Sequence, residues 1–396
     1  MQTAPTRRVA FYSHDTQGLG HIRRNITLAA ALVAAEPDTD VLLITGNPEA
    51  AALPLPPRTD VATLPTIRKD RAGRYATRAM GSPLELVLDV RASIIDAALA
   101  AFEPDLLVVD KVPLGVRGEL EPALRTLRAM GTTRTVLGLR EVLDTAEVAM
   151  AEWAAGGTTE AVEAYFDEVW VYGDPTVFDL VTEYRLPRSV ADRVVHTGYL
   201  GHGRGIGTTT RGQVRTAGPA PDPYVLCVVG GGQDGAELAE AFVRAPVPAG
   251  HSAVLVTGPY LPAARREQLQ ELAGPHTTVL GFVTDVDQLI AGAAAVVSMA
   301  GYNSVCEVLA AGVPALLAPR ETPRAEQLVR AEGLAALGLV DVLRAADLGP
   351  QAVGEWTAQA VRGPRPAGGA VDLDGLSRVP ELAAALLHPP VVLRAA

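Results

Sequence analysis

The chain has 396 residues, of which 48% are hydrophobic and 5% aromatic, so two domains that each bury a core are expected. Its formal net charge of −11 argues against a broad electrostatic footprint for nucleic acid, and no nucleic-acid partner is expected. The N-terminus lacks the apolar region of a signal peptide and no run of eighteen apolar residues occurs, which predicts a cytoplasmic protein.

A glycine-rich loop follows the first predicted strand. Val9–Tyr12 is a short apolar strand, and His21–Ala35 has the apolar spacing of a helix. Between them, Gly18 and Gly20 permit a tight turn and the close approach of a ligand to the N-terminus of that helix.

A basic segment comes after the predicted strands Val41–Thr45 and Val61–Leu64. Between Arg68 and Arg78 the chain carries five basic residues and one acidic residue, although the whole protein is acidic. This local charge suits an anionic acceptor, which would contact Arg68, Arg71 and Arg74, or peripheral docking to an anionic membrane surface. A solvated loop is the third interpretation.

Further strands are predicted at Leu106–Val109 and Thr135–Leu139, and Arg140 and Glu141 follow the second of these. Polar residues just past the carboxyl end of a strand lie where open α/β sheets bind ligands. Glu141 is therefore a candidate base or acceptor ligand, and a helix cap or an ion pair explains it equally well. Asp174 is expected to cap a helix over Thr176–Tyr184.

Strands alternate with helices on both sides of a stretch rich in glycine and proline. This alternation predicts an α/β fold of two Rossmann-like, doubly wound parallel-sheet domains facing a cleft. We place the first domain at residues 1–200, the linker at 201–223, the second domain at 224–362, and a final loop and helix at 363–396. Cys227 and Cys306 lie in apolar segments and are expected in the core, without a disulfide or a metal.

Three consecutive glycines open the second domain. The apolar strand Tyr224–Val229 runs directly into Gly230–Gly235, and a helix follows. Without side chains, this turn brings backbone N–H groups close to a diphosphate or a sugar, although a purely structural turn is the alternative. The pattern differs from the G-x-G-x-x-G of dinucleotide-binding domains, which disfavours a dehydrogenase.

A second strand, glycine turn and helix occur at Val296–Pro314. The helix after Gly301 offers unpaired N–H groups and the positive end of its dipole to an anion, and Asn303 and Ser304 lie in its first turn. Glu307 lies one turn further on, where its carboxylate suits the hydroxyls of a ribose. The pattern predicts a nucleotide-diphosphate site.

Asp285 and Asp287 have the spacing of a metal-binding D-x-D motif. Because Thr284 and Asp285 begin a predicted helix, we interpret their oxygens as helix caps, and we expect no metal.

Four motifs occur in the order found in a known family: His14–His21, Gly230–Gly235, Gly281–Val283 and Val296–Pro314. Together they resemble two-domain (GT-B type) nucleotide-sugar glycosyltransferases, above all the family of the bacterial N-acetylglucosaminyltransferase that makes the lipid intermediate of peptidoglycan. The resemblance spans most of the chain. It implies acceptor binding at the loop containing Gly18 and Gly20.

The resemblance also implies a general base in the first domain. The family's loop ends in a histidine at the position of His21, and an imidazole can remove the proton of an acceptor hydroxyl. His14, Asp15 and Glu141 are rivals for this role. A helix cap or a phosphate ligand is the alternative role for His21.

The donor is expected in the second domain. The resemblance places the donor phosphates at the triple-glycine turn, the nucleobase at Phe282 and Val283, and the sugar hydroxyls at Arg324 and Gln327. The donor-contact residues that we predict are Gly231, Gly232, Gln233, Phe282, Val283, Gly301, Asn303, Ser304, Glu307, Arg324 and Gln327. Arg320 could meet a phosphate or form a surface ion pair.

Retaining members of this architecture carry a second glutamate eight positions before the one matching Glu307, and here that position is Met299. We therefore expect an inverting, metal-independent transfer from a UDP- or dTDP-linked sugar to an acceptor hydroxyl, with no cofactor. A sugar-nucleotide 2-epimerase and a non-catalytic nucleotide-sugar-binding protein are the alternatives.

Overall fold

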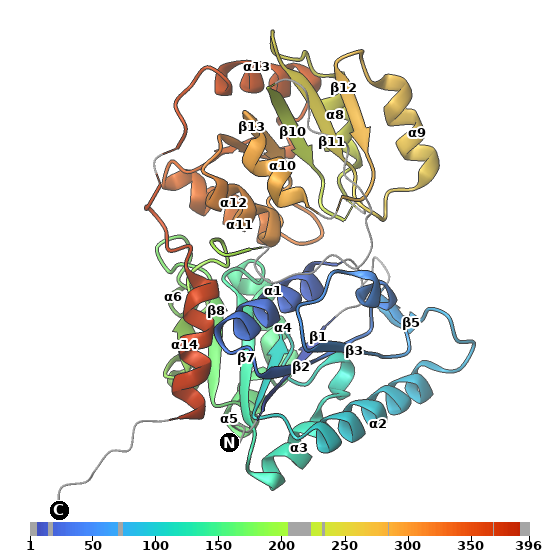
Figure 1. Cartoon of the computed structure of the whole chain (residues 1–396), viewed down its shortest axis with the longest axis vertical. Helices are drawn as coiled ribbons and strands as arrows, with labels where there is room; N and C mark the ends of the chain where they lie inside the picture. The colour runs from blue at the N-terminus through green and yellow to red at the C-terminus, as the bar shows by residue number, and fades with distance from the viewer. Residues whose placement is uncertain are drawn as a thin grey trace, which may run out of the picture.

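The computed structural model describes residues 6–14, 19–69, 74–204, 223–231, 234–283, 285–366 and 368–388. Two α/β domains lie one above the other (Figure 1). The first contains a seven-stranded parallel sheet in the order β3-β2-β1-β6-β7-β8-β9. Its strands are β1 (Arg7–Ser13), β2 (Thr39–Thr45), β3 (Thr59–Thr63), β6 (Leu106–Asp110), β7 (Arg134–Arg140), β8 (Glu168–Tyr172) and β9 (Val194–His196).

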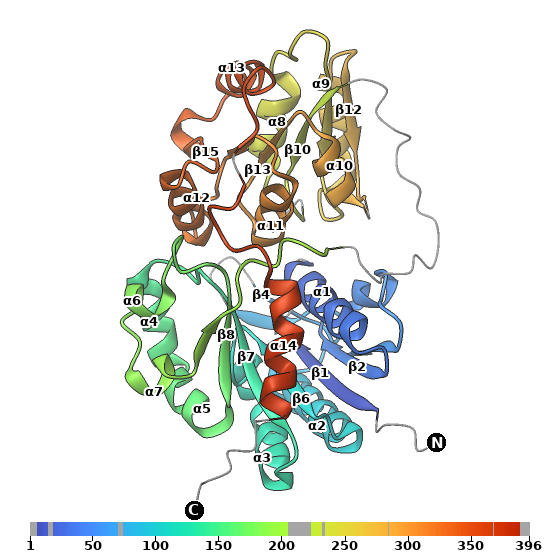
Figure 2. The same ribbon diagram turned by 60° about the vertical axis from the view of Figure 1, so that its left-hand side comes forward.

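Helices cover both faces of this sheet (Figures 1 and 2). They are α1 (Gly20–Ala35), α2 (Leu84–Phe102), α3 (Glu121–Met130), α4 (Ala146–Ala155), α5 (Thr158–Tyr165), α6 (Leu180–Glu183) and α7 (Arg188–Ala191), with 3₁₀ turns at Pro48–Ala52 and Val116–Gly118. The C-terminal helix α14 (Gly375–Leu387) returns from the second domain and packs against α1 (Figure 2).

The second domain contains a six-stranded parallel sheet in the order β12-β11-β10-β13-β14-β15. Its strands are β10 (Tyr224–Val228), β11 (Ser252–Val256), β12 (Thr277–Leu280), β13 (Ala295–Ser298), β14 (Ala315–Leu317) and β15 (Asp341–Val342). Its helices are α8 (Ala236–Arg244), α9 (Ala263–Leu272), α10 (Val286–Gly292), α11 (Tyr302–Ala311), α12 (Glu326–Ala336) and α13 (Pro350–Ala360), with a 3₁₀ turn at Ala345–Asp347.

The central strands are buried along their whole length. All five residues of β6 and all five of β10 are buried, as expected for strands of a parallel sheet covered on both faces. Cys227 and Cys306 are both buried and free, which confirms their expected place in the core. The predicted fold class is confirmed.

Each sheet changes its winding direction at one point, between β1 and β6 in the first domain and between β10 and β13 in the second. The loops that leave two such neighbouring strands diverge to opposite faces of the sheet and open a crevice at the carboxyl ends. The glycine turns predicted in the second domain follow β10 and β13, and the glycine-rich loop predicted in the first domain follows β1.

Some local predictions were wrong. Part of the basic segment forms an antiparallel hairpin of β4 (Ile67–Lys69) and β5 (Tyr75–Thr77), where a loop was one interpretation. Asp174 accepts a hydrogen bond from the backbone N–H of Thr176, but no long helix follows, because α6 begins only at Leu180 with Asp179 as its cap. None of the helices in the described ranges is both long enough and apolar enough to cross a membrane.

Candidate active site

A cleft lies between the two domains, where their switch points meet. The first domain lines it with residues of the α1 N-terminus and with Arg140 at the end of β7. The second domain contributes its two glycine turns and the start of α11. The structure thereby gathers these predicted site residues along one cleft: Gly20, His21, Gly231, Phe282, Val283, Gly301, Asn303, Ser304 and Gln327.

The turn after β10 and the loop that packs against it each depend on a glycine. Gly230 has a φ of +64°, which lies in the left-handed region that favours glycine. A Cβ on Gly258 of the neighbouring loop would lie 2.2 Å from the carbonyl oxygen of Gly230, so the two backbones are packed together. Gly230 and Gly231 thus leave bare backbone at the cleft. Gly232 and Gln233 lie outside the described residues.

The N-terminus of α11 points its free N–H groups at the same cleft. Gly301 is its N-cap and has no side chain with which to accept from the first-turn N–H groups. The side chain of Asn303 donates to the carbonyl oxygen of Gly20 over 3.1 Å, so the N-termini of α1 and α11 meet across the cleft. Two helix N-termini create a positive potential suited to a diphosphate.

His21 is held by a carboxylate that sequence reasoning did not assign. Its Nδ1 lies 2.5 Å from Oδ2 of Asp110, the last residue of β6, and Asp110 also pairs with the buried Arg24. Burial lowers the pKa of His21 to about 4, while the charge of Asp110 acts in the opposite direction. The imidazole is therefore neutral at pH 7.

The protonation of the pair follows from its charges. The neighbouring Arg24 and His21 outweigh the effect of burial and hold the pKa of Asp110 well below its usual range. The ionised Asp110 fixes the proton of His21 on Nδ1 and leaves Nε2 as a proton acceptor. The ring of His14 lies edge-on to that of His21 with centroids 6.3 Å apart. The third candidate, Asp15, is outside the described residues, as is Gly18.

Glu141 occupies a different environment from the one expected of a base. Its side chain is fully buried and bonds to Arg330 of α12 over 2.6 Å and to the hydroxyl of Tyr199 over 3.0 Å. Arg330 also donates to the carbonyl oxygen of Ala300 in the turn before α11. The ion-pair interpretation of Glu141 therefore describes its contacts, and neither oxygen is available to a substrate.

Glu307 lies in the second turn of α11 and, unlike Asn303 and Ser304, does not line the cleft. Its Oε1 accepts from Arg23 over 3.0 Å and from Arg204 over 3.4 Å. Its Oε2 is buried and has no hydrogen-bond partner among the described residues. A buried oxygen without a donor is costly, and a ribose hydroxyl could supply that donor.

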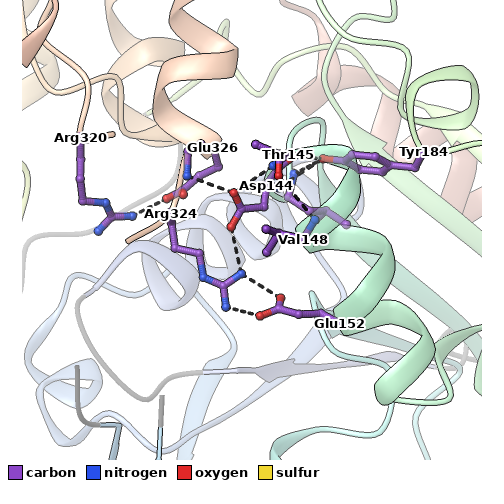
Figure 3. Close-up of polar contacts among 10 residues, drawn as sticks. Asp144, Thr145, Val148, Glu152, Tyr184, Arg320, Arg324 and Glu326 are labelled. Carbon is purple, nitrogen blue, oxygen red and sulfur yellow. Dashed lines mark hydrogen bonds and ion pairs between the residues drawn. The ribbon is translucent and has the colours of Figure 1, made fainter. Parts of the chain in front are cut away.

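Arg324 was expected to contact the donor sugar, but it does not line the cleft. Figure 3 shows its guanidinium between two carboxylates of the first domain, where it donates to Asp144 over 3.2 Å and to Glu152 over 2.8 Å. Arg324 therefore ties the two domains together, and its role as a donor contact stays a prediction. Gln327 does line the cleft, and its Oε1 accepts from the backbone N–H of Arg320 over 3.0 Å. The Arg320 side chain pairs with Asp234 and Glu326, in agreement with its ion-pair interpretation.

The remaining predicted contacts lie elsewhere. Arg68 and Arg74 belong to the β4–β5 hairpin region and do not line the cleft, and Arg71 is outside the described residues. Helix α10 begins after Asp285 as expected, but the Asp285 side chain forms no capping hydrogen bond. The described residues contain no group of three or more His, Cys, Asp or Glu side chains that could hold a metal ion.

Two Rossmann-like domains whose switch points share one cleft define the GT-B fold of nucleotide-sugar glycosyltransferases, and solved structures confirm this fold. MurG of Acinetobacter baumannii is similar over 95% of this chain and 94% of its own, with a TM-score of 0.51 and 15% identity. A putative UDP-N-acetylglucosamine 2-epimerase of Listeria monocytogenes is similar over 98% of this chain and 96% of its own, with a TM-score of 0.59 and 14% identity.

Residues 225–364, most of the second domain, match the glycosyltransferase family 28 C-terminal domain. A curated relative from Brucella suis is UDP-N-acetylglucosamine–N-acetylmuramyl-(pentapeptide) pyrophosphoryl-undecaprenol N-acetylglucosamine transferase. It is 35% identical over 104 residues, which cover 26% of this chain and 27% of the relative. The matched part thus spans about a quarter of the relative's length. The resemblance that the sequence motifs indicated is confirmed.

Proposed function

We propose that this protein is a glycosyltransferase that moves a sugar from a nucleoside-diphosphate sugar, UDP- or dTDP-linked, to an acceptor hydroxyl. One observation carries the proposal: His21 of the first domain and the glycine turns of the second domain line the same cleft. The match of the second domain to glycosyltransferase family 28 supports it, and the UDP-sugar in the name of the Brucella suis relative supports a UDP donor.

The diphosphate would lie against the backbone of Gly230 and Gly231 and the N-terminus of α11. These N–H groups and the helix dipole would stabilise the charge that develops on the leaving diphosphate, in place of a metal ion. Glu307 would accept from the ribose with its unpaired Oε2. Phe282, unusually exposed for a large apolar residue, would cover the nucleobase.

The acceptor would enter from the first domain. Nε2 of His21 would take the hydroxyl proton as the acceptor oxygen forms its bond to the anomeric carbon and the bond to the diphosphate breaks. Asp110 would act as a positioning residue by holding Nδ1–H of His21. A single displacement inverts the anomeric centre, and Met299 stands where a second carboxylate would be needed for retention.

The 2-epimerase alternative has its own support, because the Listeria monocytogenes structure shares the fold over nearly the whole chain. An epimerase would be expected to place several carboxylates and histidines around the sugar. The described cleft lining contains Asp234 as its one acidic residue and His21 as its one histidine. Product analysis separates the two functions, because epimerisation requires no acceptor.

A thermal-shift panel with UDP, dTDP, GDP and ADP, with and without magnesium, tests the donor site. A nucleotide at about a hundred times its dissociation constant adds about 2.7 kcal/mol to the folded state, a shift of several degrees. We expect one diphosphate to raise the melting temperature without magnesium. If none of the four nucleotides does so, the glycine turns have a structural role alone and the transferase proposal fails. Release of nucleoside diphosphate on adding an acceptor separates a transferase from a non-catalytic binding protein.

A further inference from the structure

Two cationic side chains stand at the carboxyl ends of neighbouring strands in the first domain. Lys111 directly follows Asp110 at the end of β6, and Arg140 is the last residue of β7. The backbone N–H of Lys111 donates to the carbonyl oxygen of Gly138 over 2.9 Å, which continues the β6–β7 pairing past the strand end. Both side chains are half-buried, and Arg140 lines the cleft.

Neither cation has a hydrogen bond or an ion pair with any residue that the structure describes. The other cations at the cleft do have such partners: Arg23 bonds to Glu307, and Arg24 bonds to Asp110. The acidic residue of the described lining, Asp234, is already paired with Arg320. Arg140 and Lys111, which we call the first-domain wall, therefore carry positive charge that no carboxylate in direct contact pairs, while Glu326 acts on both at longer range.

The environment of the two cations opposes their charge. Burial and then the nearby Arg330 lower the pKa of Arg140. Burial lowers the pKa of Lys111 to about 8, with further lowering by Arg140 and Arg324, so the two unpaired side chains lie within electrostatic range of each other. A cation partly withdrawn from water is stabilised by a contacting negative charge, and a bound anion would supply one.

The domain that holds these residues identifies the source of the anion. The donor diphosphate already has the second-domain turns and the N-terminus of α11, whereas Lys111 and Arg140 both belong to the first domain, on the side of His21. A guanidinium binds carboxylate or phosphate through two parallel hydrogen bonds, and an ammonium adds a point charge. We infer that Arg140 and Lys111 bind an anionic group of the acceptor, a carboxylate or a phosphate, in the cleft beside His21.

This inference rests on the proposed function and is tested with inorganic phosphate and acetate as probes. Calorimetric titration of the protein saturated with UDP, or with whichever diphosphate binds, leaves the acceptor side open while the donor phosphate site is filled. Wild type is compared with Arg140→Gln, Lys111→Gln and Arg140→Lys. Arg128→Gln on α3, an exposed arginine away from the cleft, is the matched control.

We expect Arg140→Gln and Lys111→Gln each to weaken binding of the preferred probe at least tenfold. Arg140→Lys should lose less because it keeps the charge, and Arg128→Gln should lose nothing. The affinity for the nucleotide should stay within about twofold in all variants. Circular dichroism verifies that each variant is folded. If Arg140→Gln does not fold, Arg140→Lys still tests the role of Arg140.

Three results would overturn the inference. If neither probe binds the wild type, these cations form no anion site. The same conclusion follows if both Gln variants bind the probe as tightly as the wild type does. If Arg140→Gln weakens the nucleotide itself tenfold, the cations serve the donor diphosphate. Should no nucleotide bind at all, the proposed function fails, and the same titration without nucleotide still decides whether Arg140 and Lys111 bind an anion.

Discussion

Glu141 and Arg330 form a fully buried ion pair that joins the two domains, with 2.6 Å between the Arg330 Nε and the Glu141 Oε1. Glu141 follows β7 of the first domain, and Arg330 lies on α12 of the second. Because Arg330 also donates to the carbonyl oxygen of Ala300, the pair couples the domain interface to the turn before α11. The geometry of the candidate donor site therefore depends on the docking of the domains.

Removing one partner should destabilise the protein strongly. Glu141→Gln or Arg330→Met leaves the other group buried and uncompensated, which typically costs about 3–5 kcal/mol. The double variant Glu141→Leu/Arg330→Met removes both charges and should recover most of that loss. Urea unfolding measures the free energies.

The exposed pair of Arg188 and Asp192 provides the control, since Asp192→Asn should cost at most about 1 kcal/mol. Equal losses in the single and double variants would contradict the expected coupling of Glu141 and Arg330.

Glu307 should determine the nucleotide response. Its unpaired Oε2 makes it the candidate ribose acceptor, so Glu307→Gln, which turns one acceptor into a donor, should reduce or abolish the thermal shift produced by the bound diphosphate. The shift is measured over a nucleotide titration and compared with that of Asp374→Asn, an exposed carboxylate outside the cleft. An unchanged dissociation constant in Glu307→Gln would exclude a ribose contact.

The sequence predicted the parallel sheets because their strands are continuous apolar runs. Leu106–Val109 was predicted and β6 spans Leu106–Asp110, all of it buried. Helix α4 was not predicted, because only Ala149 and Trp153 of its ten residues are buried and the remainder gives no periodic pattern. Apolar periodicity arises from buried residues, so it does not predict a helix or strand that buries few of them.

The candidate site was predictable as a set of positions and unpredictable as a set of partners. The glycine turns after β10 and β13, and His21 at the start of a helix, can be recognised from the residues next to them in the sequence. The contacts of His21 with Asp110 and of Arg324 with Asp144 join residues 89 and 180 positions apart. Contacts between residues so far apart in the chain cannot be predicted from the residues next to each of them. Asp110 had one usable signal, its position at the carboxyl end of a strand.

Anion binding by the first-domain wall should depend on pH through Lys111. The pKa of this side chain is about 8, so it is charged at pH 7 and loses its charge as the pH rises through 8. Arg140, Arg324, Glu152 and Glu326 are the charged groups that influence it, and none of these is expected to change its charge between pH 7 and 9. Acetate keeps the same charge over this range, whereas phosphate gains negative charge, so acetate is the probe and its affinity should fall between pH 7 and 9.

Lys111→Arg provides the comparison for this pH dependence. Its guanidinium stays charged over the whole range, so the fall in affinity should disappear. A fall of the same size in Lys111→Arg would assign the titration to another group.

His21 and Asp110 give the sharpest test of the transfer mechanism. His21→Ala should lower the rate of sugar transfer by about 10²–10⁴-fold while leaving nucleotide affinity intact, because only the general base is removed. For wild type, kcat/KM should be level near neutral pH and fall as the pH drops through about 4, where the imidazole gains a proton.

In Asp110→Asn, a carboxylate that raises the pKa of His21 is lost, so the acid limb should move to lower pH. The rate at neutral pH should drop at least tenfold, since Nδ1–H loses its ionised acceptor. Because Asp110 also neutralises Arg24, circular dichroism at each pH separates a shifted limb from unfolding. Full transfer activity in His21→Ala would remove His21 from the role of base, and an unmoved acid limb in a folded Asp110→Asn would leave Asp110 with a structural role alone.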